Sequence, residues 1–407
     1  MDFLPFLRRN WRFLLAGFIL ALTSSYGQTF FISVFAGEIM EAFDLTDGQW
    51  GLTYTVGTTV SALVMVQAGV LTDRFRVRVL THFVMAGLAC ACLVMASAPA
   101  AWVLIPSVFL LRFFGQGMLP HLSAVAMARW FTTNRGKALA TASMGFAAGQ
   151  AVLPLIFVAL LTTLDWRMLW VLAAGIVLLT IPVMIPLLRL ERTPQSMAQQ
   201  DQSAGMDGVH WTRRAMLSHR LFWLMVPALL GPPAWGTALF FQQVHLTEVK
   251  GWPLVSFVAL FPLLTVTVIG STFATGWLVD RLGTGRLIPF YLLPFAAGFA
   301  VIALAPSIPV AAIGLMLVGL GQGQQGTLIA AFWAEFYGTR HLGAIKAVGA
   351  AVMVFASAVG PGITGVLIDA GIYFPQQMLW LVGYFLLAAG AATIGVLTAR
   401  PRLTALA

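Results

Sequence analysis

The sequence predicts an all-α integral membrane protein in which twelve transmembrane helices form two pseudo-symmetric six-helix bundles. Three observations lead to this fold class: the composition, the number of long apolar runs, and an internal repeat along most of each half. Of the 407 residues, 59% are hydrophobic and only 9% are charged. Because roughly a quarter of the residues in a soluble domain are charged, a chain of this composition is expected to lie in a lipid bilayer.

Twelve apolar runs are long enough to span a membrane. A bilayer core of roughly 30 Å requires about 20 predominantly apolar residues in each helix. The first run follows Arg8 and Arg9, as in a signal peptide, but it is too long for one and is predicted to be an uncleaved first helix. The runs lie at about 13–39, 50–72, 79–98, 102–127, 138–162, 167–188, 220–245, 253–279, 286–305, 309–334, 344–368 and 377–398.

A polar segment separates the sixth run from the seventh. Residues 191–219 are rich in glutamine, aspartate, serine and glycine, and they are predicted to form a cytoplasmic linker. The linker divides the chain into an N-terminal six-helix bundle over 1–190 and a C-terminal six-helix bundle over 220–407. Within it, Trp211 to His219 form either a short interfacial helix or part of the loose linker.

Short sequence motifs recur in the two halves at a nearly constant spacing. One shared spacing of 206 to 210 positions along most of the chain indicates a duplicated six-helix unit rather than chance matches. The matching pairs are Tyr26-Gly27 with Trp235-Gly236, Gly115-Gln116-Gly117 with Gly321-Gln322-Gly323, and Leu169-Trp170 with Leu379-Trp380.

A charged turn of the form G-x-x-x-D-R joins the second and third runs and returns 207 positions later. The first copy contains Asp73 and Arg74, and the second contains Asp280 and Arg281. On these residues the chain resembles the major facilitator superfamily of secondary transporters, whose signature loop between helices two and three has this form. The resemblance implies two bundles related by an axis along the membrane normal, with a solute site near the midplane lined by runs one, four, seven and ten.

The charged loops on the inner side are predicted to gate and brace the bundles without touching substrate. By the resemblance, the two signature turns belong to inner latches that stabilise an outward-open state. Further along, two charged residues flank the end of run ten in a similar inner loop. The predicted gating and structural residues are Asp73, Arg74, Asp280, Arg281, Glu335 and Arg340.

Positive charges fall almost entirely on one predicted side of the membrane. Of the 23 lysines and arginines, only Arg167 and Lys250 fall outside, and Arg112 lies within the membrane. The positive-inside rule then places both termini in the cytoplasm and predicts a bacterial-type inner (plasma) membrane. The net charge of +9 is explained by this placement, so no nucleic acid partner is expected. The resemblance implies a monomer.

Arg112 is the only clearly ionised side chain near the middle of a predicted membrane helix. A lone arginine there costs about 2.5–3.5 kcal/mol on insertion scales, so it must face protein or water and find a partner. By resemblance it matches an arginine in helix four of many superfamily members. It is predicted to contact substrate or to take part in proton coupling; the alternative is a structural arginine bonded to backbone carbonyls. Gln116 follows one turn later on the same face and could share a ligand.

Buried amides and aromatic rings supply the other candidates for the substrate site. An amide in hydrocarbon without a partner is costly, so each glutamine within a run is expected to face substrate or a neighbouring helix. Tyr26 and Trp235 occupy repeat-related positions near mid-depth, where they are either cavity walls or packing residues. The predicted substrate-binding residues are Arg112, Gln116, Gln322, Gln325, Tyr26, Trp235, Gln28 and Gln150.

The leading interpretation is a secondary transporter that moves a small organic solute by alternating access, coupled to a proton or another ion. No acidic residue lies at mid-depth, and the one buried charge is positive, which favours an anion such as a carboxylate. The run-four motif Arg-Phe-Phe-Gly-Gln-Gly is similar to the monocarboxylate and oxalate/formate branch. That branch usually carries a key cation in helix eight, which run eight lacks.

Two alternatives stay open: an efflux antiporter for drugs or metabolites, and a transport-dead sensor or scaffold with the same fold. An enzyme is not predicted, because the sequence contains no phosphate-binding loop, metal-ligand cluster or nucleophile arrangement. No cofactor and no metal are therefore expected. The expected partners are a small-molecule substrate, a coupling proton or ion, and the lipid bilayer.

Overall fold

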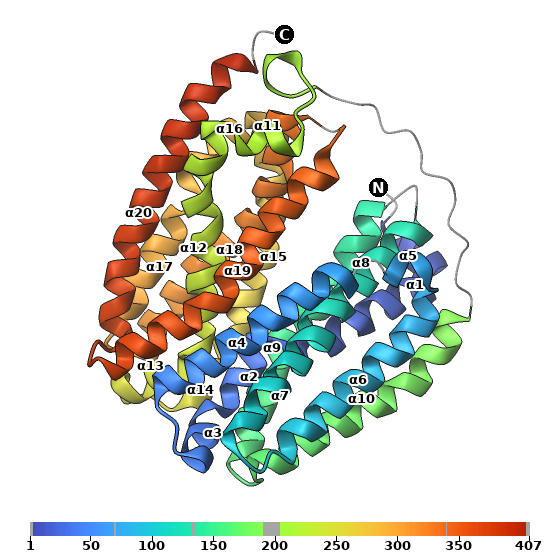
Figure 1. Cartoon of the computed structure of the whole chain (residues 1–407), viewed down its shortest axis with the longest axis vertical. Helices are drawn as coiled ribbons and strands as arrows, with labels where there is room; N and C mark the ends of the chain where they lie inside the picture. The colour runs from blue at the N-terminus through green and yellow to red at the C-terminus, as the bar shows by residue number, and fades with distance from the viewer. Residues whose placement is uncertain (1–2, 69–70, 132–134, 190–203, 339, 404–407) are drawn as a thin grey trace. The chain divides into compact units, whose positions relative to one another are not determined.

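The computed structural model describes residues 3–68, 71–131, 135–189, 204–338 and 340–403. Within these ranges all regular structure is helical and no strand occurs. The chain divides into two compact units, unit 1 (Met1–Ala198) and unit 2 (Gln199–Ala407), each of which is a bundle of long helices (Figure 1). Residues 191–203 of the predicted linker lie outside the described ranges, whereas 204–219 are described.

Among the described residues, nine helices are long and apolar enough to cross a bilayer, and a bent helix pair forms a tenth span. That pair is the first predicted run, which was expected to be one continuous helix. It is bent by 49° between Pro5–Gly27 and Thr29–Phe43. The second and tenth predicted runs form α4 (Asp47–Ala68) and α18 (Ile308–Tyr337), of 22 and 30 residues. Both are long enough to span, but their threonines, glycines and glutamines lower their mean hydropathy.

Unit 1 is built by the packing of α1 on α9, of α6 on α10, and of α4 on α7, as Figure 1 shows for α6 and α10. Its helical elements are α1 (Phe3–Thr23), η1 (Ser24–Gly27), α2 (Thr29–Ile32), η2 (Ser33–Phe35), α3 (Ala36–Phe43), α4, α5 (Leu71–Arg74), α6 (Val77–Ala96), η3 (Ala101–Val103), α7 (Leu104–Leu110), η4 (Leu111–Met118), α8 (Leu119–Trp130), α9 (Arg135–Leu161) and α10 (Trp166–Leu188).

Unit 2 is built by the packing of α15 and α17 on α18, and of α19 and α20 on α12. Its helical elements are η5 (Met206–Gly208), α11 (Arg213–Leu217), α12 (Arg220–Phe241), α13 (Gln243–Lys250), α14 (Leu254–Val258), α15 (Phe261–Leu282), α16 (Thr284–Leu287), η6 (Ile288–Phe290), α17 (Leu293–Leu304), α18, α19 (Leu342–Asp369), α20 (Phe374–Ala399) and η7 (Arg400–Arg402).

The core of unit 1 is an aromatic cluster around Phe31, just beyond the bend in the first span. The ring centroid of Phe31 lies 5.1 Å from that of Tyr26, 4.8 Å from Phe157 and 5.4 Å from Trp170, all in edge-to-face arrangements. Such pairs contribute about 0.5–1.5 kcal/mol each beyond their buried area. The cluster therefore fixes the far side of the bend against α9 and α10.

Helix α12 of unit 2 continues through three prolines without a break. Because Pro232 has no N–H, it cannot donate to the carbonyl of Ala228 four residues earlier. The hydroxyl of Tyr291 donates to that carbonyl at 2.5 Å instead. The hydroxyl of Tyr384 donates to the carbonyl of Pro227 at 2.7 Å. Two tyrosines from neighbouring helices thus satisfy helix carbonyls in the proline-rich part of α12.

The two predicted outer cations have a structural role in their units. In unit 1, Nη1 of Arg167 donates to two carbonyls at the C-terminal end of α6, at 2.9 and 2.8 Å. In unit 2, Nζ of Lys250 donates to two carbonyls at the C-terminal end of α17, at 2.6 and 3.1 Å. The last carbonyls of a helix have no partner within it and favour positive charge. Each unit thus places one cation at the end of its third long helix.

Replacing Arg167 by alanine should destabilise the protein. The change removes two charge-assisted hydrogen bonds and leaves helix carbonyls unpaired, so we expect the free energy of unfolding to fall by about 1–3 kcal/mol. Thermal unfolding of the purified protein in detergent measures this. Arg167→Lys is the matched control, because Lys250 makes the same contacts in unit 2 with an ammonium group. Equal melting temperatures for Arg167→Ala and the wild type would contradict the assignment.

Candidate functional site

The first span of unit 1 breaks at a short polar stretch near its middle. Ser24–Gly27 form a tight 3₁₀ turn, and Gln28 then adopts an extended conformation with φ −87° and ψ 153° before the helix restarts at Thr29. An extended residue cannot continue the helical hydrogen-bond pattern. The break therefore leaves the carbonyl of Gly27 available to a side chain from another helix.

The fourth span approaches this break more closely than any side chain would permit. A Cβ on Gly27 would collide with the carbonyl oxygen of Leu111 and lie 2.6 Å from Cα of Gly115. The segment that meets Gly27 is the π-helix η4, which is wider than an α-helix and occurs frequently at functional sites. Two glycines, one on each span, thus bring backbone against backbone.

This close approach buries Arg112, which lies on η4 and is 1% exposed. Its Nη1 donates to the carbonyl of Gly27 and to Oγ1 of Thr29, both at 3.2 Å. Its guanidinium carbon lies 5.3 Å from the ring centroid of Tyr54 on α4, within cation–π range. The hydroxyls of Tyr54 and Thr29 are hydrogen-bonded at 2.5 Å. The first span and α4 of unit 1 therefore hold the guanidinium that the fourth span carries.

The edge of this guanidinium away from Nη1 is unpaired. Nε and Nη2 of Arg112 are buried and have no hydrogen-bond partner among the described residues. These two N–H groups lie side by side in the plane of the guanidinium and form the fork that binds a carboxylate through two parallel hydrogen bonds. Each buried donor without a partner costs about 1–3 kcal/mol, so an acceptor that binds this edge would stabilise the site.

The other predicted residues of unit 1 surround the break in different ways. Tyr26 is buried and packs in the aromatic cluster around Phe31, so its ring has a packing role. Gln28 is the extended residue of the break and is buried. Gln116 lies on η4 with Arg112 and is half-buried, and Gln150 is buried on α9.

The predicted residues of unit 2 lie on α12 and α18. Trp235 is half-buried, its ring centroid lies 5.7 Å from that of Tyr384, and its Nε1 has no hydrogen-bond partner among the described residues. Nε2 of Gln322 would lie 3.9 Å from a Cβ on Gly236, so this amide faces the repeat-related glycine of α12. Nε2 of Gln325 lies 3.9 Å from the sulfur of Met353.

The predicted gating residues are divided between bracing contacts and exposed positions. Glu335 of α18 accepts hydrogen bonds from the backbone N–H and the hydroxyl of Thr284, at 2.8 and 2.7 Å, and so caps the start of α16. Asp280, Arg281 and Arg340 are exposed, and Arg281 lies over the ring of Trp277 at 4.0 Å. The side chains of the first copy, Asp73 and Arg74, lie outside the described part of the structure.

Sequence reasoning missed Thr29 and Tyr54, the two side chains that hold Arg112. The signal for the first was present in the stretch Ser24-Ser25-Tyr26-Gly27-Gln28-Thr29, where a polar segment with serine, glycine and threonine interrupts an apolar run. Such an interruption indicates a break in a membrane helix and hence a free carbonyl. No comparable signal distinguishes Tyr54 from other membrane tyrosines.

Comparison with known proteins agrees with this architecture. The family model of the Major Facilitator Superfamily matches residues 17–361. No curated protein gives a significant match. Among solved structures, a bacterial homolog to the human lysosomal transporter Spinster, inward-facing and unoccupied, has a TM-score of 0.73 at 16% identity, covering 96% of this chain and 97% of that chain. The occupied, inward-facing structure of such a homolog has a TM-score of 0.68 at 16% identity, covering 96% and 94%.

The fold and the apolar spans define an integral membrane protein of the secondary-transporter class rather than an enzyme. More specifically, the chain belongs to the major facilitator superfamily, whose model covers most of its length. The predicted superfamily and all-α membrane fold are confirmed. At 16% identity, the likeness to the Spinster homologs concerns the fold alone.

Replacing the repeat-related glycines Gly27 and Gly236 by alanine should destabilise the protein in the first case and leave it nearly unchanged in the second. Gly27→Ala forces the backbones of the first span and η4 apart and should destabilise unit 1 by about 1–3 kcal/mol or more. Gly236→Ala is the matched control, because its Cβ would meet only Nε2 of Gln322, at 3.9 Å. Thermal unfolding and solute flux of both variants test the difference. If both variants behave alike, the close approach at Gly27 is not the constraint described.

Proposed function

We propose that the protein is a secondary active transporter that moves a small organic anion, such as a carboxylate, by alternating access. The observation that carries the proposal is the unpaired Nε and Nη2 edge of Arg112 in unit 1. A planar carboxylate matches this edge through two parallel hydrogen bonds, whereas a neutral solute forms weaker ones and a cation is repelled.

Several features of the site support an anion rather than a cation. No carboxylate of the described residues pairs with Arg112, so its charge is not neutralised within that part of unit 1. The residues that contact it supply a carbonyl, a hydroxyl and an aromatic ring. A carboxylate is also what the similarity of the run-four motif to the monocarboxylate and oxalate/formate branch leads us to expect.

The proposal also covers topology, coupling and oligomeric state. The protein lies in a bacterial-type inner membrane with both termini on the cytoplasmic side, in accordance with the distribution of arginine and lysine. Transport is coupled to a proton or another ion, and a carboxylate substrate could itself carry the proton to Arg112. Gln28, Gln116 and Gln150 of unit 1 and Gln322 and Gln325 of unit 2 provide further polar contacts. The protein acts as a monomer.

Access to Arg112 requires part of the protein to move. The side chain is 1% exposed, so a solute cannot reach its free edge without displacing neighbouring groups. Opening and closing around a buried site is what alternating access requires of a transporter. We therefore assign the buried fork to a closed form of the site in unit 1.

Uptake into proteoliposomes tests the proposal. A panel of small carboxylates, neutral solutes and organic cations is offered with and without a pH gradient. We expect carboxylate uptake that is abolished in Arg112→Leu. Arg112→Lys keeps the charge but loses the fork, so its KM should rise about tenfold or more. Uptake of cations by the wild type would instead favour the efflux antiporter, and zero flux of every solute would favour the sensor or scaffold.

The hydroxyl of Thr29 gives a second test, because it holds the paired edge of Arg112. Thr29→Val keeps the shape but removes the oxygen that accepts from Nη1, so the guanidinium loses part of its orientation. We expect KM for the carboxylate to rise several-fold with little change in the amount of folded protein. Thr29→Ser retains the oxygen and should restore the wild-type KM. A similar KM for the valine and serine variants would argue against this role.

A further inference from the structure

Residues 204–219 form a cap over one end of unit 2. The backbone N–H of Trp211 donates to the carbonyl of Tyr337 at 3.2 Å, at the end of α18. The indole Nε1 of Trp211 donates to the carbonyl of Met206 at 3.1 Å, which closes the cap on itself. A Cβ on Gly205 would lie 2.5 Å from the backbone of Tyr337, so the chain passes directly over the helix end.

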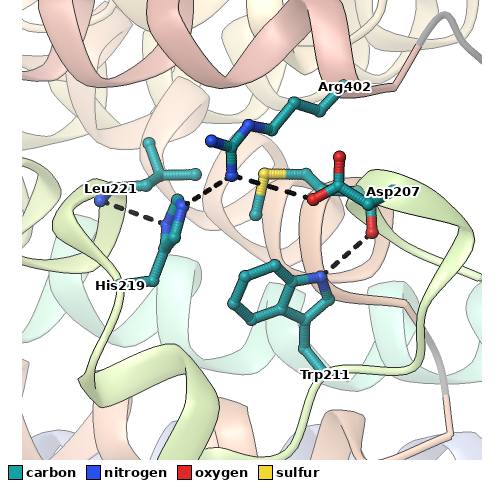
Figure 2. A network of polar contacts seen from close by, with 6 residues as sticks. Asp207, Trp211, His219, Leu221 and Arg402 are labelled. Atoms are coloured by element: carbon teal, nitrogen blue, oxygen red, sulfur yellow. Dashed lines mark hydrogen bonds and ion pairs between the residues drawn. The ribbon is translucent and has the colours of Figure 1, made fainter.

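His219 connects this cap to α12 and to the end of α20. Its Nδ1 accepts from the backbone N–H of Leu221 at 3.3 Å, as an N-cap of α12. Its Nε2 faces Nη1 of Arg402 at 3.3 Å. Figure 2 shows the imidazole between Leu221 and Arg402, with Trp211 nearby; the rings of Trp211 and His219 are 4.9 Å apart.

The contact of His219 with Leu221 requires a lone pair on the ring. Leu221 N–H and the Arg402 guanidinium are donors only, and a neutral imidazole has one accepting nitrogen, so it accepts from Leu221 at Nδ1 and presents an N–H at Nε2 to Arg402. A protonated imidazole has none, so Leu221 would then also face an N–H group. Protonation would also place a positive ring beside two arginines, Arg402 and Arg220.

Arg402 is held in place from its other side by Asp207. The carboxylate of Asp207 lies 3.7 Å from Nη1 of Arg402, and Figure 2 shows Arg402 between Asp207 and His219. Asp207 has a left-handed backbone with φ 58°, which is uncommon for a residue with a side chain. Two arginines next to the cap, Arg402 and Arg220, thus oppose a charge on His219, and one carboxylate in the cap, Asp207, favours it. The cap contains a second histidine, His210.

We propose that His219 is a pH-sensitive latch, whose protonation releases the cap of residues 204–219 from the ends of α12 and α20. With the neutral ring, the cap ties together α12, α18 and α20. With the charged ring, α12 loses its N-cap and Arg402 faces a positively charged neighbour. The proposal is independent of the substrate and of Arg112.

The electrostatic surroundings set the direction of the response. Burial lowers the pKa of His219 below its ordinary 6.5, as do the charges of Arg402 and Arg220, while Asp207 raises it. In the released cap the ring regains its ordinary pKa, so the released form binds protons more tightly. The latch is therefore fully closed above the ordinary pKa. Acidification through and below that value favours release, until the closed form is protonated as well.

Hydrogen exchange measured by mass spectrometry on the full-length protein tests the latch. Peptides covering residues 204–223 are followed from pH 7.5 to 5.5, with rates corrected for intrinsic exchange. In the wild type we expect protection to fall with acidification, by up to about tenfold per pH unit between the two pKa values. His219→Asn is the control, because asparagine caps a helix but does not titrate in this range. The second histidine of these peptides, His210, is replaced by asparagine in both proteins, so the protection of the control should be independent of pH.

Two charge variants make the test specific. Arg402→Gln removes a charge that lowers the pKa of His219, so its transition should move to higher pH. Asp207→Asn removes the opposing charge, so its transition should move to lower pH. A wild-type profile that matches His219→Asn would overturn the proposal. So would protection that increases in acid, which would show that the charged ring pairs with Asp207 and tightens the cap.

Discussion

The close approach of the first span to the π-helix η4 determines the character of unit 1. Two glycines, Gly27 and Gly115, allow the backbones to touch, and the break beside them frees a carbonyl. A buried guanidinium is stable in hydrocarbon only where such acceptors exist. The position of Arg112, its partly satisfied state and the proposed anion chemistry all depend on this contact, with Thr29 and Tyr54 fixing the orientation.

The two halves repeat in sequence but differ at their centres. In unit 1, Gly27 meets the backbone of η4 and the first span breaks. In unit 2, a Cβ on Gly236 would meet only the side chain of Gln322, and α12 continues through its prolines. In unit 2 the hydroxyl of Tyr291 satisfies the buried carbonyl of Ala228, whereas in unit 1 the guanidinium of Arg112 satisfies the carbonyl of Gly27. The two halves thus share a helix scaffold, but the unpaired carbonyls at their backbone irregularities bind different side chains.

Sequence patterns predicted the all-α membrane scaffold, because long apolar runs follow directly from the bilayer. They also made Arg112 a candidate for the solute site, since an isolated charge at mid-depth has few explanations. They could not predict which edge of the guanidinium is paired, because that depends on a break in one span and a π-helix in another. Tyr54 and Thr29 become partners only through this three-dimensional contact. Of the two roles that the sequence left open for Tyr26, cavity wall or packing residue, its ring contacts in the aromatic core favour packing.

The contact at Gly27 has a consequence for how this protein can diverge. A side chain larger than hydrogen at position 27 or 115 would separate the spans and remove the carbonyl that holds Arg112. Arginine without that carbonyl would be an uncompensated charge in hydrocarbon. Gly27, Gly115 and Arg112 are therefore expected to be kept or replaced together. Lineages that lose either glycine should also lose the arginine, and a change of transported solute would proceed through their joint replacement.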